Sequence, residues 1–184
     1  KTSGEVFFHM HRLVQSILKD LLEGDERHRY AEQAVRVVNR TVASLYFAEW
    51  HRYHHYIAHA RVCVALIQDE AIVSEDAAQL LSWVAGYLHE QGQYTEAEAL
   101  VTQSLTMLSK IDVLVHQNVL ENINQLATIH LDRGQFEEAE KLYRRALVSL
   151  QHVHGQIKPL LQATLYNNLG ELYTATEKND DAEN

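Results

Sequence analysis

Residues 94–108, YTEAEALVTQSLTML, and residues 136–150, FEEAEKLYRRALVSL, carry the same pattern twice. Gly92 and Gly134 precede the two copies at the same distance, which sets a period of 134 − 92 = 42 residues. In both copies, small and apolar residues recur at steps of three and four, the spacing of one face of an α-helix. The aligned positions are Ala97, Leu100, Val101, Ser104, Leu105 and Leu108 in the first copy, and Ala139, Leu142, Tyr143, Ala146, Leu147 and Leu150 in the second.

An apolar helical segment also precedes each glycine: QLLSWVAGYLHEQG before the first copy and NINQLATIHLDRG before the second. Each unit is therefore predicted to be a helical hairpin. Alanines 85, 97, 127 and 139 place small side chains where the backbones of neighbouring helices approach closely. A hairpin of this kind buries its apolar face only against another hairpin, so the pattern predicts a stack.

These units resemble the tetratricopeptide repeat, which has small residues within both helices, a glycine before the turn and an aromatic residue after it. The resemblance covers residues 74–150, and a third unit begins at LLQATLYNNLGELY. In that unit Glu177 stands at the glycine position and Asn179 at the aromatic position, so its turn departs from the pattern. The period of 42 residues is similar to the long-helix variety in kinesin light chains and signalling ATPases. The resemblance implies an all-α, right-handed superhelix of about two and a half hairpins.

The residues before the repeats follow other patterns. GEVFFHMH alternates like a half-buried strand, and RLVQSILKDLLEG predicts a helix that ends at Gly24. Two more helices are expected, over DERHRYAEQAVRVVNR and from about Glu49 to Gln68. We therefore predict three parts: a strand and helix at 1–24, a helical connector at 25–73, and the repeats at 74–184.

HMHRLVQSIL, AEQAVRVVNR and WHRYHHYIAHARVC, in this order before the hairpins, look like the exit from the winged-helix part of an NB-ARC ATPase, a member of the STAND signalling class. The resemblance implies that 1–24 is a winged-helix remnant. It also implies that a nucleotide-binding core lies upstream and that Lys1 is not the natural start.

Composition narrows the function classes. A net charge of −9 disfavours a nucleic-acid partner, and no apolar run is long enough for a membrane helix. Neither GxxxxGK[ST] nor GxGxxG occurs, so no nucleotide cofactor is expected here. The single cysteine and the absence of a signal-peptide pattern favour a cytoplasmic location.

Two groups of side chains could bind a metal ion or take part in catalysis. His51, His55 and His59 share a helix face, with His54 beside them, and imidazoles can bind zinc or copper. Three residues spread over two turns seldom converge on one ion, so a packed or solvated face is the favoured interpretation and no metal is expected. Cys63 lies four residues after His59, but a lone cysteine in RVCVALI is more often a small buried residue. We expect no catalysis by this chain.

The candidate binding residues are those that the resemblance directs into the concave groove. A row of carboxamides offers hydrogen-bond donors and acceptors to the backbone of an extended peptide. Carboxamides would also be tolerated on a solvated helix face, or in a groove that is filled by a helix or a neighbouring domain. Acidic side chains favour a basic or neutral ligand. The candidates are Ser82, His89 and Glu90; Asn124, Gln125, Thr128 and Asp132; and Asn167, Asn168 and Glu171.

The expected function is a protein- or peptide-binding scaffold. The resemblances point to the sensor and hinge of an NB-ARC-type ATPase, with that domain as the adjoining partner. The alternative is a free-standing adaptor resembling kinesin light chain.

Overall fold

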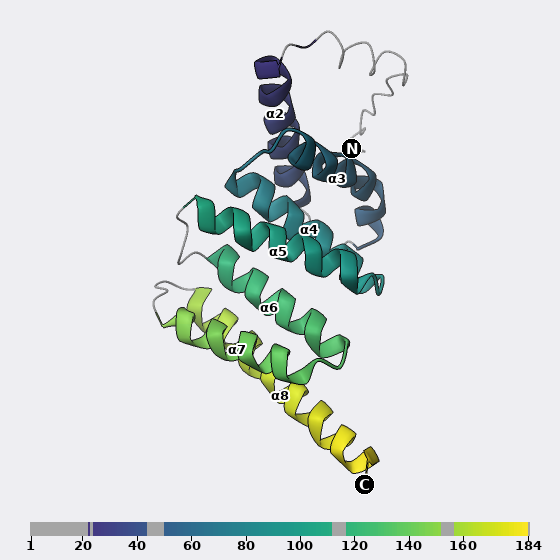
Figure 1. Ribbon diagram of the computed structural model, residues 1–184, viewed down its shortest axis with the longest axis vertical. Coiled ribbons are helices and arrows are strands. Elements are labelled where there is room, and N and C mark those ends of the chain that lie inside the picture. Colours follow the sequence, from purple (N-terminus) through teal and green to yellow (C-terminus); the bar gives the residue numbers. More distant parts are fainter. Residues whose placement is uncertain (1–21, 23, 44–49, 112–116, 152–156, 184) are drawn as a thin grey trace, which may run out of the picture.

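A computed structural model describes residues 22, 24–43, 50–111, 117–151 and 157–183. The strand and helix predicted within 1–24 lie outside these residues, apart from Leu22 and Gly24. In the described part the chain is entirely helical, as predicted (Figure 1). None of the described helices is long and apolar enough to cross a membrane.

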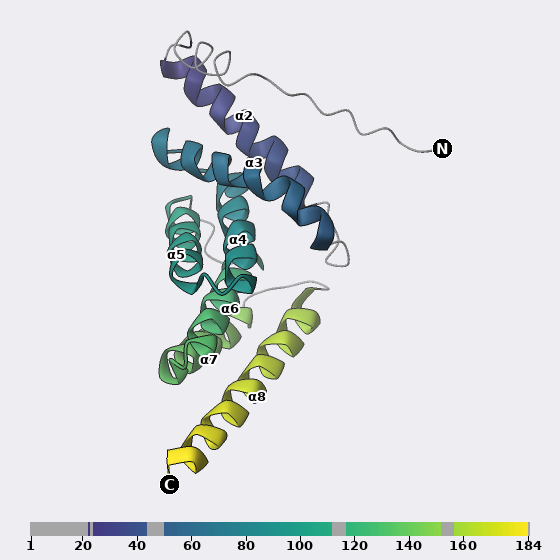
Figure 2. The ribbon, with the colours of Figure 1, turned by 90° about the vertical axis from the view of Figure 1, so that its right-hand side faces the viewer.

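Seven described helices follow one another along the stack (Figures 1 and 2). The segment at 25–73, predicted to be a connector, holds α2 and α3. Hairpin α4–α5 is the first predicted unit, α6–α7 the second, and α8 begins the third. Their bounds are α2 Gly24–Ala43, α3 Trp50–Asp69, α4 Glu75–Glu90, α5 Tyr94–Lys110, α6 Gln117–Asp132, α7 Phe136–Leu150 and α8 Ile157–Glu183.

The turns inside the two full hairpins have the same geometry. Gly92 and Gly134 have φ of +72° and +71°, in the left-handed region that glycine adopts without a steric penalty. The Gly92 N–H donates to the His89 carbonyl at 2.8 Å, and the Gln93 N–H donates to the Leu88 carbonyl at 2.9 Å. This pair of bonds is a Schellman motif, which satisfies the last carbonyls of the first helix. The glycines therefore end α4 and α6 and turn the chain back.

A third turn of this kind, not predicted from the sequence, ends α3. Ala71 has φ of +50°, and the Ile72 N–H donates to the Ile67 carbonyl at 3.0 Å. An alanine in this conformation is strained by roughly 1–2 kcal/mol because its Cβ approaches the next carbonyl oxygen. The strain is tolerated here because Ile72, immediately after the turn, is only 1% exposed and packs in the core.

The third unit differs from the two full hairpins at the position of the turn. Helix α8 runs without interruption from Ile157 to Glu183, through Glu177 and Asn179, where the turn was expected. The physical reason is the missing glycine, because glutamate at this position favours right-handed helix over the left-handed turn conformation. The third unit is therefore one long helix in the described chain.

Helix α4 begins at a side-chain cap. The Ser74 hydroxyl accepts a hydrogen bond from the Ala77 N–H at 3.2 Å. Glu75 and Asp76 follow in the first turn, where carboxylates interact favourably with the positive end of the helix dipole. This cap sets the start of the first full repeat.

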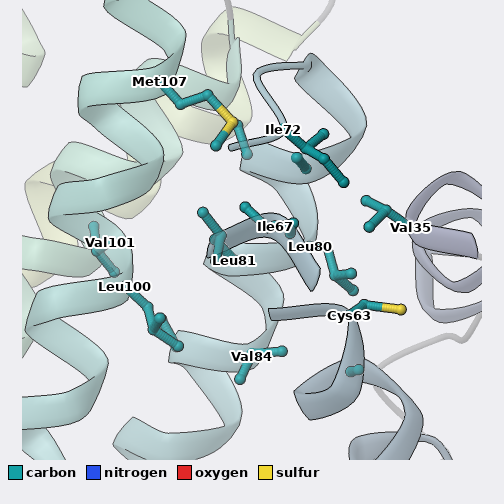
Figure 3. Packing of buried hydrophobic residues seen from close by; sticks show 14 of the residues in the cluster. Val35, Cys63, Ile67, Ile72, Leu80, Leu81, Val84, Leu100, Val101 and Met107 are labelled. Carbon is teal, nitrogen blue, oxygen red and sulfur yellow. The ribbon is translucent and has the colours of Figure 1, made fainter. Parts of the chain in front are cut away.

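The core consists of two clusters joined between the two repeats. The first cluster combines α2, α3, α4 and α5 with Ile129 of α6, so Val35 and Cys63 belong to the same core as Leu81 and Val101 (Figure 3). The second combines α6, α7 and α8. Leu105 of α5 packs against both. Burial of each large apolar side chain stabilises the stack by roughly 1.5–3 kcal/mol.

Exchanging glycine and alanine at three positions tests the turns. Ala71→Gly should raise the free energy of unfolding by about 1 kcal/mol because it relieves the strained φ, and Gly134→Ala should lower it by about the same amount. Gly170→Ala is the matched control, since Gly170 lies inside α8, where alanine is the better helix former by roughly 1 kcal/mol. Urea unfolding measures all three, and a stabilising Gly134→Ala would contradict the turn geometry.

Candidate functional site

A row of polar pairs joins α4 to α6. The pairs are Glu75 with Asn118, Ser82 with Gln125, and His89 with Asp132, and the two partners are 43 residues apart in every pair. Successive pairs are seven residues, or about two helical turns, further along. A constant separation requires that α4 and α6 run in the same direction in one fixed register. We call these six residues the polar ladder.

The central pair of the ladder is reciprocal. The Ser82 hydroxyl donates to Gln125 Oε1 at 3.0 Å, and Gln125 Nε2 donates to the Ser82 carbonyl at 3.2 Å. The Gln125 amide also approaches Gly86, where an added Cβ would lie 3.1 Å from Nε2. The glycine therefore leaves room for the side chain that joins the two helices.

The two outer pairs contain charged groups. Asn118 Nδ2 donates to Glu75 Oε1 at 2.9 Å. His89 Nε2 lies 2.6 Å from Asp132 Oδ2, and the His89 ring also packs at 5.6 Å from the ring of Tyr94. The His89 side chain is 16% exposed and that of Asp132 is 40% exposed. The carboxylate of Asp132 is therefore open to solvent beside the pair.

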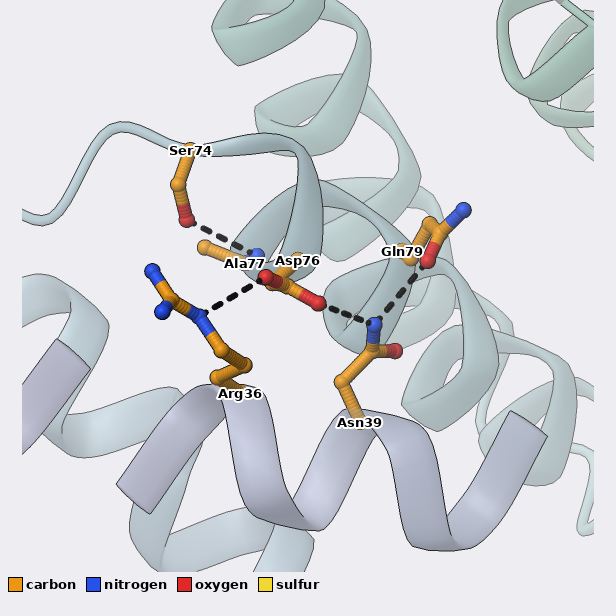
Figure 4. A network of polar contacts seen from close by, with 6 residues as sticks. All are labelled: Arg36, Asn39, Ser74, Asp76, Ala77 and Gln79. Atoms are coloured by element: carbon orange, nitrogen blue, oxygen red, sulfur yellow. Dashed lines mark hydrogen bonds and ion pairs between the residues drawn. The ribbon is translucent and has the colours of Figure 1, made fainter. Parts of the chain in front are cut away.

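Polar contacts of the same kind join α2 to α4 (Figure 4). Asn39, only 3% exposed, donates from Nδ2 to Asp76 Oδ1 at 3.0 Å and to Gln79 Oε1 at 2.9 Å. Arg36 Nε lies 3.4 Å from Asp76 Oδ2. Helix α2 is thus joined to the first repeat by a charged and a neutral contact.

The carboxamides predicted to grip a peptide are partly used within the protein. Asn168 Nδ2 donates to Asn124 Oδ1 at 2.8 Å, which joins α8 to α6. Asn167 donates to Glu171 Oε1 at 2.9 Å within α8, and both side chains are exposed. Asn124 and Asn167 therefore differ in role, although they hold the same repeat position.

A buried polar group lies behind this face. Ser104, fully buried, donates to the Ala78 carbonyl at 2.8 Å and accepts from Asn122 Nδ2 at 2.8 Å. The Asn122 Oδ1 atom is buried without a hydrogen-bond partner. These three residues join α4, α5 and α6, so a shift of any one helix would leave further buried groups unsatisfied.

Thr128 was predicted to face the groove, and its hydroxyl lies 3.0 Å from the hydroxyl of Tyr143. Tyr143 is fully buried, and burial raises the pKa of its phenol above the ordinary value. The phenol therefore stays neutral at physiological pH and holds α7 against α6.

Most of the predicted binding residues contact other residues of the protein. Ser82, His89, Gln125 and Asp132 belong to the polar ladder, Asn124 and Asn168 pair with one another, and Thr128 contacts Tyr143. Glu90 is exposed near the end of α4, and Asn167 and Glu171 are exposed on α8. The prediction missed Glu75, Asn118, Asn39, Arg36, Asp76 and Gln79. The contact between Glu75 and Asn118 could have been found from the sequence, because these polar residues have the same separation of 43 residues as Ser82 and Gln125 and as His89 and Asp132.

The structure describes the candidate reactive cysteine fully and the candidate metal-binding histidines only in part. Cys63 is 3% exposed in the core, and burial raises the pKa of its thiol to about 11, which confirms the expected buried side chain. His59 is exposed, while the side chains of His51, His54 and His55 lie outside the described ones. Among the described residues, no three histidine, cysteine or carboxylate side chains come together in a way that could hold a metal ion.

A double-mutant cycle tests the polar ladder. We expect Ser82→Ala and Gln125→Ala to be coupled by about 1 kcal/mol in the free energy of unfolding, because their hydrogen bonds are reciprocal. The control cycle combines Ser82→Ala with Asn118→Ala, from a different pair, and should be additive. Urea unfolding of the variants gives both values, and additive effects in the first cycle would show that the pair does not form.

Comparisons with known proteins agree with this architecture. The sequence pattern described as tetratricopeptide repeat matches residues 76–151 and again residues 120–184. Among solved structures, the fold is similar to that of BtubC (BKLC) from P. vanneervenii, with a TM-score of 0.64 and 20% sequence identity over 94% of this chain and 76% of that one. No curated protein matches this sequence.

The two matches together span residues 76–184, which is more than half of the chain. They include both glycine turns, five of the six residues of the polar ladder and all of α8. The chain belongs to the tetratricopeptide repeat family.

Proposed function

We propose that this chain is a protein-binding scaffold that holds an extended peptide or protein segment along α4, α6 and α8, without catalysis of its own. The observation that carries the proposal is the polar ladder, which places α4 and α6 in register and leaves polar groups at its edge, while the contact between Asn124 and Asn168 joins α8 to α6. Glu90 and Asn167 are exposed there, and the Asp132 carboxylate is 40% exposed. Amide and carboxylate groups at this edge can bind the N–H groups of a peptide backbone.

The charge of this face selects among peptides. Glu90, Asp132 and Glu171 are acidic, while His89 already contacts Asp132. Opposite charge speeds encounter and excludes like-charged partners. The expected ligand is therefore neutral or basic, with lysine or arginine side chains next to its bound backbone.

Selection from a phage-displayed library of random 12-residue peptides tests this proposal. Enriched peptides should be rich in lysine and arginine, and Asn167→Ala should weaken their binding about fivefold, the equivalent of one hydrogen bond. The matched control is Gln103→Ala, which removes a carboxamide from α5. Fluorescence anisotropy with a labelled enriched peptide measures the affinities, and equal binding by the Asn167 and Gln103 variants would contradict the proposal.

Asn124→Ala requires its own control because Asn124 also contacts Asn168. Both Asn124→Ala and Asn168→Ala break the contact between α6 and α8. Only the first also removes the Asn124 amide from the face. A greater loss of binding in Asn124→Ala separates a direct contact with the peptide from the loss of helix register.

We further propose that the scaffold is the sensor and hinge of an NB-ARC-type signalling ATPase. The support is the order of HMHRLVQSIL, AEQAVRVVNR and WHRYHHYIAHARVC before the repeats. The test is the parent gene upstream of the Lys1 codon, which should encode GxxxxGK[ST] after a predicted strand. A start codon directly before Lys1 would contradict this proposal and favour a free-standing adaptor.

A further inference from the structure

Helix α2 lies beside α4 in a fixed register, as α6 does. Arg36 contacts Asp76. Asn39 contacts Gln79, and the partners of both pairs are 40 residues apart. A constant separation means that α2 and α4 run in the same direction. Helix α2 therefore extends the face formed by α4, α6 and α8, while α5 and α7 lie on the opposite side (Figure 2).

The charge of this extended face changes from one end to the other. Helices α4 and α6 contain five acidic residues and no lysine or arginine. Helix α2 contains four arginines. Three of them, Arg29, Arg36 and Arg40, recur at steps of seven and four and therefore share one side of the helix. We call these three residues the basic row.

The guanidinium groups of the basic row are open to solvent. The side chain of Arg29 is 60% exposed and that of Arg36 is 53% exposed. Arg40, one turn after Arg36, is also exposed. The contact of Arg29 with Glu26 is long, at 3.8 Å. The basic row is thus accessible to an anionic partner.

A chain of contacts orients Arg36. Asn39, only 3% exposed, donates to Asp76 Oδ1, and Asp76 Oδ2 lies 3.4 Å from Arg36 Nε. The two Nη groups of Arg36 point away from Asp76 (Figure 4). A guanidinium has five N–H donors in a rigid plane, so these groups can donate to a second carboxylate. The contact with Asp76 therefore holds the guanidinium in place and leaves its Nη groups available to a further anion.

We propose that the basic row binds acidic side chains of the segment held along α4, α6 and α8, so that this ligand is acidic where it crosses α2. This inference rests on the proposed function and adds a binding region on α2, which lies outside the residues that match the repeat family. Arginine binds carboxylates through paired, charge-assisted hydrogen bonds. Asp132 and Glu171 repel the acidic end and attract the basic one, so the ligand has a single orientation across the helices.

The separation of the helices sets the spacing of charges in the ligand. The axes of packed neighbouring helices are about 8–10 Å apart, so α2 and α6 are separated by roughly 20 Å. An extended peptide rises about 3.3 Å per residue. The acidic and basic residues of the ligand should therefore be separated by about six residues.

Two labelled peptides with blocked ends, EESTSTSTKK and QQSTSTSTKK, test this arrangement. They differ only in the negative charge at one end, because glutamine has nearly the same shape as glutamate. Binding to the full chain is measured by fluorescence anisotropy at low ionic strength, where exposed charges are weakly screened. The Kd of the glutamate peptide should be at least fivefold lower than that of the glutamine peptide.

Variants of the chain locate the acidic end of the peptide. Arg36→Gln combined with Arg40→Gln should bind both peptides equally. Arg145→Glu, on α7, is the matched control, because it also lowers the net charge by two, and it should keep the fivefold preference. Thermal unfolding checks that the variants are folded. If the double variant is unfolded, Arg40→Gln alone replaces it and should reduce the preference to about twofold.

The possible results separate this inference from the function on which it rests. Equal binding of the two peptides by the unchanged chain would overturn the inference and leave the proposed function in place, because the lysine end still binds. Binding of neither peptide would contradict both. A preference that survives the double variant, or that Arg145→Glu also abolishes, would overturn the assignment of the acidic end to α2.

Discussion

The fixed register between α4 and α6 is the constraint on which the rest of the structure depends. Three polar pairs, each 43 residues apart, allow only one alignment of the two helices. A shift by one turn would separate each donor from its acceptor and leave partly buried groups unsatisfied. The glycine turns at Gly92 and Gly134 then place α5 and α7 at equivalent positions behind this pair.

Burial of apolar side chains stabilises the stack, whereas the polar contacts determine how its helices are aligned. The side chains of the two clusters are aliphatic for the most part, and burial alone does not distinguish one sliding position of a helix from the next. Ser104 and Asn122 select one sliding position inside the core, because their hydrogen bonds form in one arrangement of the helices only. The polar ladder selects the same position at the surface. The face proposed to bind peptides is a consequence of this repeated geometry.

Much of the fold could be predicted from the sequence because the repeat period and the helix period are both visible in it. The two glycines predicted the turns, and the small residues at 85, 97, 127 and 139 predicted buried contacts, which the structure confirms. The turn at Ala71 could not be predicted, since alanine rarely adopts a positive φ and no glycine marks the position. The candidate site was predicted only in part. Helical spacing shows on which face a side chain lies, but the partner of Ser82 or Asn124 depends on how the neighbouring helix is aligned.

The most direct test of this register is a distance measurement by cross-linking. Ser82→Cys and Gln125→Cys, introduced together, should react with both ends of dibromobimane, a short thiol cross-linker that fluoresces when both ends have reacted. Cys63 should not interfere, because it is buried and its thiol has a pKa of about 11. Ser82→Cys combined with Asn118→Cys or Asp132→Cys should give little fluorescence, since these partners lie two turns, or about 10 Å, away along α6. The fixed register of α4 and α6 predicts strong fluorescence for the first pair alone, and equal fluorescence from all three pairs would contradict it.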